Sequence, residues 1–562
     1  MRARLSRRNF VQASVTTFGL ELAASRARTA PATRSGRRIA PGPFQPSWPS
    51  LVQNYRVPEW FLDAKFGIWA HWSAQCVPEQ GDWYARQMYL QGNPVYEHHV
   101  KTYGHPSAFG FMEIDHLWKA ERWEPEKLMS LYARAGAKYF FALANHHDNF
   151  DAYASRYHAW NSVNVGPKRD VVGTWAKVAR AHGLRFGVSN HSAHAWHWFQ
   201  VAYGYDAEGP QRGVRYDAAR LTKADGKGKW WEGLDPQQLY TGRNIVAPDG
   251  IATIPEMKEW HERNDRIWNE NPPPNNPAFT ENWFLRCQDL IDHYQPDVVY
   301  FDDTELPLGQ AGLDIVAHYY NANFARNKGK LDVVVNAKHM QPEHVPALVE
   351  DIERGVTTGI RQHPWQTDTC IGGWHYSRAI AEKNQYKTAG QIIRMLLDIV
   401  SKNGNLMLNV PLRGDGSIDA LEQVILEELA AWMKTNSEGI FGSRPWHVYG
   451  EGPATLETPE AGEFGGARDV RRQAYALEDI RFMTRPNALY AYLLAPKPAA
   501  QLVIKSLAKN SPQIAAGRKV TQVSLLGGGS LEWWHEERGL RVKLPERLPS
   551  AEAVGLRIGG VS

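Results

Sequence analysis

Short runs of apolar residues alternate with amphipathic stretches along most of this 562-residue chain. The runs are rich in β-branched and aromatic residues, as buried strands are, and the segments 125–135 and 171–182 have helical spacing. Strands that alternate with helices predict a parallel sheet covered by helices. The runs interpreted as strands are Phe66-Gly-Ile-Trp-Ala, Tyr139-Phe-Phe-Ala-Leu, Phe186-Gly-Val-Ser, Val298-Val-Tyr-Phe and Leu331-Asp-Val-Val-Val.

The extent of the alternation favours an α/β fold with a (β/α)8-like barrel, which we place at residues 60–448. A doubly wound sheet is the alternative, but no glycine-rich dinucleotide-binding fingerprint follows any of these strands. Residues 204–260 have no clear periodicity and predict a long insertion over one face. A last barrel helix is expected around a core-facing stripe formed by Leu421, Val424, Ile425, Leu429 and Trp432.

The last part of the chain, residues 449–562, has a different texture, with short strand-like segments separated by turn signals. Such a pattern predicts a C-terminal β-sandwich, with a hairpin at Glu537-Arg-Gly. The segments expected as strands are 488–494, 501–507, 520–526 and 531–544.

The N-terminus resembles an export signal. Paired arginines in Ser6-Arg7-Arg8-Asn9-Phe10 precede a mildly apolar stretch, as in twin-arginine signal peptides, so we assign residues 1–35 to a signal peptide and the start of a linker. Residues 36–59 are expected to continue the linker. No later stretch approaches the roughly 20 apolar residues of a membrane span, which predicts an exported protein, periplasmic or secreted.

Composition narrows the choice of ligand. A net charge of +4 with no dominant basic stripe gives little electrostatic support to a nucleic-acid partner. Cys76, Cys287 and Cys370 fit no zinc-binding spacing, and no structural disulfide is expected. The 22 tryptophans are unusual: they suit ligands with apolar and polar faces, such as sugars, although a core merely rich in Trp is the alternative.

Polar residues follow the first four predicted strands, at the end of a barrel where enzymes of this architecture place their chemistry. Imidazoles hydrogen-bond hydroxyls and indoles stack on rings, so the set suits an uncharged polyhydroxylated ligand. A metal at His146-His147 is the alternative, but neighbouring side chains on a strand point to opposite faces, and Asp302-Asp303 could instead cap a helix. The strand ends are His71-Trp72, Asn145-His146-His147-Asp148, Asn190-His191 and Asp302-Asp303-Thr304-Glu305.

Glycoside hydrolysis requires two carboxyl groups that flank the bond. Asp302 offers the first. The second is expected from a later loop, where Glu350-Asp351-Ile-Glu353 supplies candidates.

A series of short motifs runs in order through the predicted barrel, over roughly residues 60–446. They are Lys65-Phe-Gly-Ile-Trp-Ala-His71-Trp72, Asp82-Trp83-Tyr84-Ala-Arg86-Gln-Met88-Tyr, Ala135-Gly-Ala-Lys-Tyr139, His146-His147-Asp148-Asn-Phe150, Gly166-Pro-Lys168-Arg169-Asp170, Gly183-Leu-Arg-Phe-Gly187, Val400-Ser-Lys-Asn403-Gly404-Asn405-Leu-Met-Leu-Asn409 and Asp415-Gly416. Together they resemble the α-L-fucosidases of glycoside hydrolase family 29, and that resemblance implies a (β/α)-type barrel followed by a β-sandwich.

The resemblance implies an exo-acting enzyme that hydrolyses terminal α-L-fucosyl linkages of oligosaccharides or glycoconjugates, with retention, through a covalent fucosyl-enzyme. It implies that Asp302, in Tyr300-Phe301-Asp302, is the nucleophile, and it implies neither a metal nor another cofactor. The residues expected at the substrate, from the resemblance and from their places at strand ends, are His71, Trp72, Asp82, Trp83, His146, His147, Asn190, Tyr300, Lys338 and Trp365.

Four positions depart from the family pattern. Tyr300 replaces a Trp, Asp82 replaces a Glu, and Lys338 replaces an Arg, which turns a bidentate contact into a point charge. Gln366 stands where many members carry Glu. Because an amide cannot donate and retrieve a proton, Gln366 cannot be the acid/base.

The acid/base is therefore sought in the loop before Trp365. Glu353 is the first candidate and Glu350 the second, with Glu305 and Asp351 as further alternatives. The separation from Asp302 decides among them, because retaining glycosidases hold their two carboxyl groups about 5–5.5 Å apart.

Two other functions stay open. One is a non-catalytic fucose-binding protein on the same fold, which the changes at Gln366, Lys338 and Tyr300 leave open. The other is an α-L-galactosidase-type enzyme, whose pocket would accept a hydroxymethyl group in place of the methyl group of fucose. Discrimination between two such groups by a hydrophobic pocket is worth only about 1–3 kcal/mol. Linkage preference and aglycone depend on loops such as 204–260.

Overall fold

The computed structural model describes residues 37–266, 268–455, 467–468, 474–515 and 517–561. Eight parallel strands close into a barrel in the order β1-β2-β3-β4-β5-β6-β8-β9, which confirms the predicted fold class. The strands are β1 (Phe66–Ala70), β2 (Tyr139–Asn145), β3 (Arg185–Asn190), β4 (Val298–Thr304), β5 (Val334–Lys338), β6 (Val349–Asp351), β8 (Trp365–Cys370) and β9 (Gly404–Asn409). The first four begin within one residue of the prediction, whereas β5 begins at Val334 and not at Leu331.

Alternation along the strands decides which side chains face the barrel interior. In β4, Val298 and Tyr300 belong to the cluster inside the barrel, while Val299 and Phe301 belong to the cluster shared with the surrounding helices. Successive strand residues point to opposite faces. Asp302 has the same parity as Val298 and Tyr300, so the strand turns its carboxylate toward the inside at the carboxyl end.

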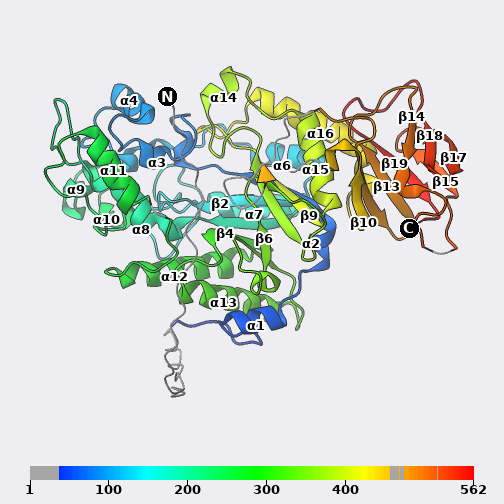
Figure 1. The fold of residues 1–562 in the computed structure, drawn as a ribbon. Helices are drawn as coiled ribbons and strands as arrows, with labels where there is room; N and C mark the ends of the chain where they lie inside the picture. Colours follow the sequence, from blue (N-terminus) through cyan, green and yellow to red (C-terminus); the bar gives the residue numbers. More distant parts are fainter. Residues whose placement is uncertain (1–36, 267, 456–466, 469–473, 516, 562) are drawn as a thin grey trace, which may run out of the picture. The chain divides into compact units, whose positions relative to one another are not determined.

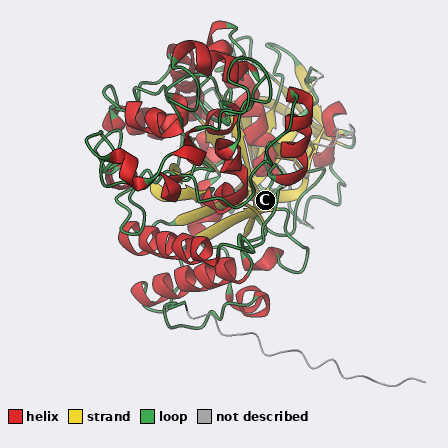
Figure 2. Ribbon diagram, turned by 90° about the vertical axis from the view of Figure 1, so that its left-hand side faces the viewer, coloured by secondary structure: helices red, strands yellow, loops and turns green. Residues whose placement is uncertain are grey.

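Helices surround the barrel, as the red helices and yellow strands of Figure 2 show. The predicted helices are confirmed as α6 (Pro125–Arg134) and α7 (Val171–Ala181), and α12 (Pro277–Tyr294) packs beside α13 (Gln310–Arg326) (Figure 1). Local signals fix their starts: the Asp170 side chain accepts a hydrogen bond from the Gly173 N–H at the beginning of α7.

The last barrel helices are α15 (Ala389–Ser401) and α16 (Ala420–Asn436). In α16 the expected stripe is partly wrong. Ile425, Leu429 and Trp432 are buried, but Leu421 and Val424 are 38% and 55% exposed. Each helix residue turns by about 100°, so Val424 points well away from the buried face centred near Ile425 and Leu429.

The linker expected at residues 36–59 is largely folded instead. It contains α1 (Trp48–Asn54), and α2 (Glu59–Ala64) follows directly. Phe44 and Tyr55 are buried and contact the ring of Tyr320 on α13. Burial of these aromatic rings against the outer layer of the barrel favours a folded segment, although its Pro-rich composition is typical of a linker. The predicted signal peptide lies outside the described residues.

The insertion at residues 204–260 consists of short turns and helices, in agreement with its lack of periodicity. They include α9 (Asp217–Arg220), α10 (Pro236–Leu239) and the first part of α11 (Ile254–Asn264). It contains a small apolar cluster of Tyr205, Ala207, Ala247 and Met257, and the buried carboxylate of Asp217 accepts hydrogen bonds from the hydroxyls of Tyr89 and Tyr240.

Two antiparallel sheets with one shared apolar core follow the barrel, which confirms the predicted β-sandwich. The larger sheet has the order β10-β12-β13-β19-β15-β16 and the smaller one β14-β18-β17, and the expected hairpin joins the last two of these. The strands are β10 (Arg444–Glu451), β12 (Ile480–Arg485), β13 (Ala488–Leu493), β14 (Gln501–Ile504), β15 (Gln522–Leu525), β16 (Gly529–Ser530), β17 (Glu532–Glu536), β18 (Gly539–Lys543) and β19 (Val554–Gly559). A short β7 (Gly355–Val356) pairs with β11 (Ala467–Arg468).

Two further sequence expectations concern the whole chain. Cys76, Cys287 and Cys370 are all buried, and no disulfide joins them. None of the helices in the described part of the chain combines the length and the hydrophobicity that crossing a bilayer requires.

Candidate active site

A cavity of about 580 Å³ opens at the carboxyl ends of the barrel strands. Its deepest aromatic residues, Trp69 and Tyr300, are each only 1% exposed, whereas Trp268 at its mouth is 41% exposed. The cavity is lined by Trp69, His71, Asp82, Trp83, Gln87, His146, His147, His191, Trp268, Tyr300, Asp302, Asp303, Lys338, His339, Glu353, Arg354, Asp368, Trp374 and His375.

Asp302 is surrounded by groups that favour its carboxylate form. Its Oδ1 lies 2.5 Å from Lys338 Nζ, and its Oδ2 lies 3.0 Å from His191 Nδ1 and 3.4 Å from His147 Nε2. Burial alone raises the pKa of this carboxyl, but Lys338 and the two imidazoles outweigh that effect and hold the pKa well below 3.8. Asp302 is therefore a carboxylate at neutral pH, as a nucleophile must be.

Glu353 is the second cavity-lining carboxyl group that contacts Lys338. Its Oε2 also contacts Lys338 Nζ. Since one ammonium nitrogen contacts both carboxylates, the two contacting oxygens are at most about 5 Å apart, closer than the roughly 6.5–9.5 Å that separates the carboxyl groups of inverting glycosidases. Burial raises the pKa of Glu353 to about 7, although Lys338 opposes the shift.

The other acid/base candidates lie elsewhere. Glu350 accepts a hydrogen bond from the Met340 N–H and pairs with Arg361. Glu305 binds the His344 imidazole and the Gln341 N–H. Asp351 is buried and accepts a hydrogen bond from the Gln366 amide at 2.7 Å. Of the four predicted candidates, only Glu353 lines the cavity.

Buried imidazoles form the deep wall of the cavity. His71, His146 and His191 contact one another ring to ring, with centroids 4.8–5.2 Å apart. Burial lowers the pKa of all three, so the rings are neutral at pH 7. Neither ring nitrogen of His71 has a hydrogen-bond partner among the described residues. Neutral rings with unsatisfied nitrogens are suited to the hydroxyl groups of a bound ligand.

The same rings are close enough to hold an ion. The ligand atoms of His71, His146 and His375 lie within 4.8 Å of one another, as do those of His146, His147 and His191. A cation held there would be coordinated by the same ring nitrogens that are suited to hydroxyl groups, so the two trios fit either use.

A buried network lies beneath the cavity and includes two of the family departures. The Tyr300 hydroxyl donates to Asp368 Oδ2 at 2.8 Å. Gln366 accepts from the Tyr139 hydroxyl at 3.0 Å and donates to Asp351. The Gln366 amide therefore forms hydrogen bonds inside the barrel, and it does not line the cavity.

Three residues predicted at the substrate lie elsewhere. Trp72 packs among other indoles and donates to the Arg413 carbonyl. Asn190 contacts Trp283 on α12, and Trp365 donates to the Lys402 carbonyl. All three point outward from the barrel because they have the opposite strand parity to the cavity-lining residues. The other predicted residues, His71, Asp82, Trp83, His146, His147, Tyr300 and Lys338, line the cavity.

Sequence reasoning missed several lining residues. Trp69 precedes His71 by two positions on β1, so strand parity could have found it. His375 comes from the loop after β8 and contacts Asp82 through its backbone N–H at 2.6 Å. Trp268, His339 and Arg354 lie on loops where the sequence has no periodic signal.

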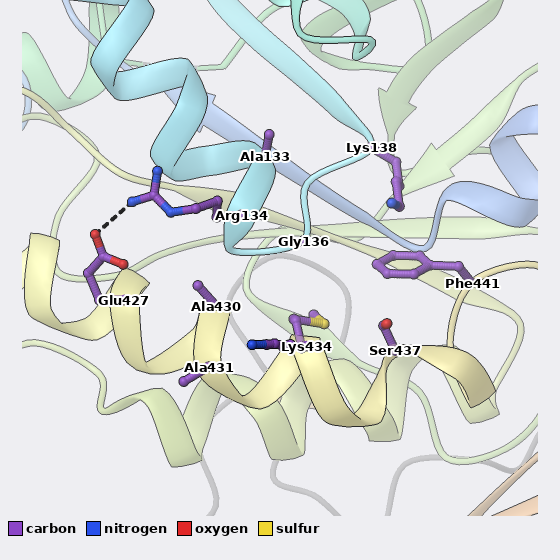
Figure 3. A pocket seen from close by; sticks show the side chains of 11 residues that line it. Ala133, Arg134, Gly136, Lys138, Glu427, Ala430, Ala431, Lys434, Ser437 and Phe441 are labelled. Carbon is purple, nitrogen blue, oxygen red and sulfur yellow. Dashed lines mark hydrogen bonds and ion pairs between the residues drawn. The ribbon is translucent and has the colours of Figure 1, made fainter. Parts of the chain in front are cut away.

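A second hollow, of about 540 Å³, lies between the end of α6 and α16 (Figure 3). Three of its charged groups have partners, since Arg134 forms an ion pair with Glu427 and the Lys138 ammonium lies 4.3 Å from the centre of the Phe441 ring, and Lys434 also lines the hollow. Lys138 precedes β2, so this hollow lies at the amino end of that strand. It lacks the paired carboxyl groups of the main cavity.

The family model and the known proteins that this chain resembles are all described as alpha-L-fucosidases. A family model described as alpha-L-fucosidase matches residues 32–438. Human tissue alpha-L-fucosidase is 25% identical over 533 residues, which cover 92% of each chain, and the human plasma enzyme is 23% identical over 515 residues, 90% of this chain and 89% of that one.

Solved structures share the fold. A Thermotoga maritima alpha-fucosidase in complex with a mechanism-based inhibitor superposes with a TM-score of 0.65 at 23% identity, covering 92% of this chain and 100% of the other. Alpha-L-fucosidase isoenzyme 1 from Paenibacillus thiaminolyticus gives 0.57 at 19% identity, covering 91% and 99%.

Proposed function

The chain belongs to the α-L-fucosidase family of glycoside hydrolases, and from this premise we propose that it removes terminal α-L-fucosyl groups by double displacement, with Asp302 as nucleophile and Glu353 as acid/base. The observation that carries the proposal is that the Asp302 and Glu353 carboxyl groups both form an ion pair with the Lys338 ammonium group. Their pKa values are pushed in opposite directions, that of Asp302 down and that of Glu353 up to about 7. Such a division is what a nucleophile and a proton donor require.

In the first step, an Asp302 oxygen attacks the anomeric carbon while the bond to the leaving oxygen breaks. Glu353 transfers its proton to that oxygen, so the leaving group departs as a neutral alcohol. The product is a fucosyl ester of Asp302, and Glu353 is now a carboxylate.

In the second step, the Glu353 carboxylate takes a proton from water, and the water oxygen attacks the anomeric carbon. The ester bond to Asp302 breaks, which restores both carboxyl groups and releases fucose with its original configuration. Lys338 supports both steps, because its charge stabilises whichever carboxylate is present.

The experiment that tests the proposal is hydrolysis of 4-nitrophenyl α-L-fucoside beside the matching α-L-galactoside. We expect turnover of the fucoside with a clear preference in kcat/KM. Tight binding of fucose without release of nitrophenol would instead identify a sugar-binding protein, and a preference for the galactoside would assign the chain to the related glycosidase.

The pH profile follows from the two carboxyl groups. Glu353 must be protonated at the start, so kcat/KM is expected to decline above about pH 7, and it declines on the acid side only below the ordinary pKa of Asp302, near 4. Lys338 lowers the pKa of both carboxyl groups. Loss of its charge in Lys338→Met is therefore expected to move both limbs of the pH profile to higher pH. Lys338→Arg keeps the charge and is expected to leave both limbs in place. If neither limb of the pH profile moves in Lys338→Met, Lys338 does not lower the pKa values of the two carboxyl groups.

We also propose that the chain is exported, on the strength of the paired arginines and the apolar stretch in residues 1–35. N-terminal sequencing of protein recovered from outside the cytoplasm is expected to begin beyond this segment. Replacement of Arg7 and Arg8 by Lys is expected to retain the protein in the cytoplasm.

A further inference from the structure

One indole stands at the mouth of the cavity with much of its surface in solvent. Trp268 is 41% exposed. Its ring stacks on His194 with centroids 3.8 Å apart and meets His147 edge-on at 5.4 Å. His147 in turn lies 3.4 Å from Asp302. Trp268 is therefore separated from the nucleophile by a single imidazole ring, on the side where the cavity opens.

The position of this indole is fixed relative to the nucleophile. The Thr304 N–H donates to Glu270 Oε1 at 2.7 Å, and Glu270 Oε2 lies 3.4 Å from His194 Nε2. Thr304 ends the same strand that carries Asp302. Glu270 follows Trp268 by two residues, so it ties the loop of the indole to the strand of the nucleophile. Burial raises the pKa of Glu270 to about 9, so this contact is made by a neutral carboxyl at pH 7.

Another part of the cavity lining is polar. His339 and Arg354 follow β5 and β6, line the same cavity and are exposed. The mouth thus offers an apolar ring on one side and nitrogen donors on another. A pyranose ring has matching surfaces, with C–H bonds on its faces and hydroxyls at its edge.

We propose that Trp268 is the platform of a leaving-group subsite, which binds the sugar ring attached to the departing oxygen. The inference rests on the fucosidase function proposed above and adds the residue that binds the pyranose ring of the leaving group. The fucosyl ring occupies the buried, histidine-lined part of the cavity, and the next sugar stacks on the indole outside it. Glu270 is a positioning residue that acts through Trp268.

The test compares two substrates that differ only in the leaving group. α-L-Fucosyl fluoride has no ring to stack, whereas an α-L-fucosyl disaccharide does; the disaccharide is the one that the wild type cleaves best among the α1,2, α1,3, α1,4 and α1,6 isomers. Trp268→Ala is expected to lower the ratio of kcat/KM for disaccharide to that for fluoride by about tenfold or more, and Trp268→Phe by less.

Trp230→Ala is the matched control. Trp230 is 37% exposed and also stacks on a histidine, His116, at 4.2 Å, but it does not line the cavity. Its replacement is expected to leave the substrate ratio unchanged. Glu270→Ala is expected to lower the ratio as Trp268→Ala does, and Glu270→Gln, which mimics the neutral carboxyl and keeps an acceptor for Thr304, to restore it.

The outcomes separate the two proposals. If the wild type cleaves neither substrate, the fucosidase function itself fails. If it cleaves both and Trp268→Ala and Trp268→Phe leave the ratio as it is, or lower both activities equally, the subsite is wrong while the function stands. Thermal unfolding midpoints near that of the wild type confirm that each variant is folded.

Discussion

Asp302→Gly is expected to lose at least about 10⁴-fold in kcat toward an aryl α-L-fucoside, because the variant lacks the carboxylate that attacks the anomeric carbon. The glycine also leaves space where the carboxylate was. Azide entering that space is expected to restore release of the aryl group and to give β-L-fucosyl azide, since it attacks from the face that Asp302 used. Steady-state rates and NMR of the azide product measure both effects.

Asp303→Asn provides the contrast. Asp303 is the next residue on the strand and is more deeply buried than Asp302, and its carboxylate lies 2.9 Å from His194 rather than against Lys338. Its replacement is expected to cost far less activity and to show no rescue by azide. Rescue of Asp303→Asn, with none for Asp302→Gly, would reassign the nucleophile.

Glu353→Ala is expected to divide substrates by their leaving groups. Toward a fucosyl oligosaccharide, whose leaving oxygen needs a proton, kcat/KM is expected to fall about 10²–10⁴-fold. Toward 2,4-dinitrophenyl α-L-fucoside it stays near the wild-type value, because that group leaves without a proton. Azide then accelerates turnover by replacing the water that Glu353 no longer activates, and the product is α-L-fucosyl azide.

The matched variant is Glu350→Ala. Glu350 lies three residues earlier but pairs with Arg361 outside the cavity. We expect it to leave the dependence on leaving group unchanged. If Glu350→Ala shows that dependence and Glu353→Ala does not, the proton donor is Glu350.

Much of the fold could be predicted because each signal is local. The first four strands are short β-branched or aromatic runs, and the amphipathic helices that cover them have clear starts. The linker prediction at residues 36–59 is wrong for a non-local reason. Whether Phe44 and Tyr55 are buried depends on Tyr320, which is distant in the sequence.

The candidate site divides in the same way. Residues with inward parity at strand ends, such as His71 and Asp302, could be predicted to share a cavity. Trp72 and Asn190 also follow or end strands but point away from the cavity, because a position at a strand end does not by itself specify the face on which the side chain lies. Trp268 and His375 reach the cavity from irregular loops, whose course depends on tertiary contacts that no periodicity encodes.

The most direct test of the mechanism is to trap its covalent intermediate. The wild type is incubated with 2-deoxy-2-fluoro-α-L-fucosyl fluoride, which forms the glycosyl-enzyme readily and releases it slowly, and the digested protein is mapped by mass spectrometry. The account predicts one fluorofucosyl group, on the peptide and side chain of Asp302. A label on another carboxyl group, such as Glu353 or Asp368, or an unlabelled enzyme that releases β-L-fucose as its first product, would contradict it.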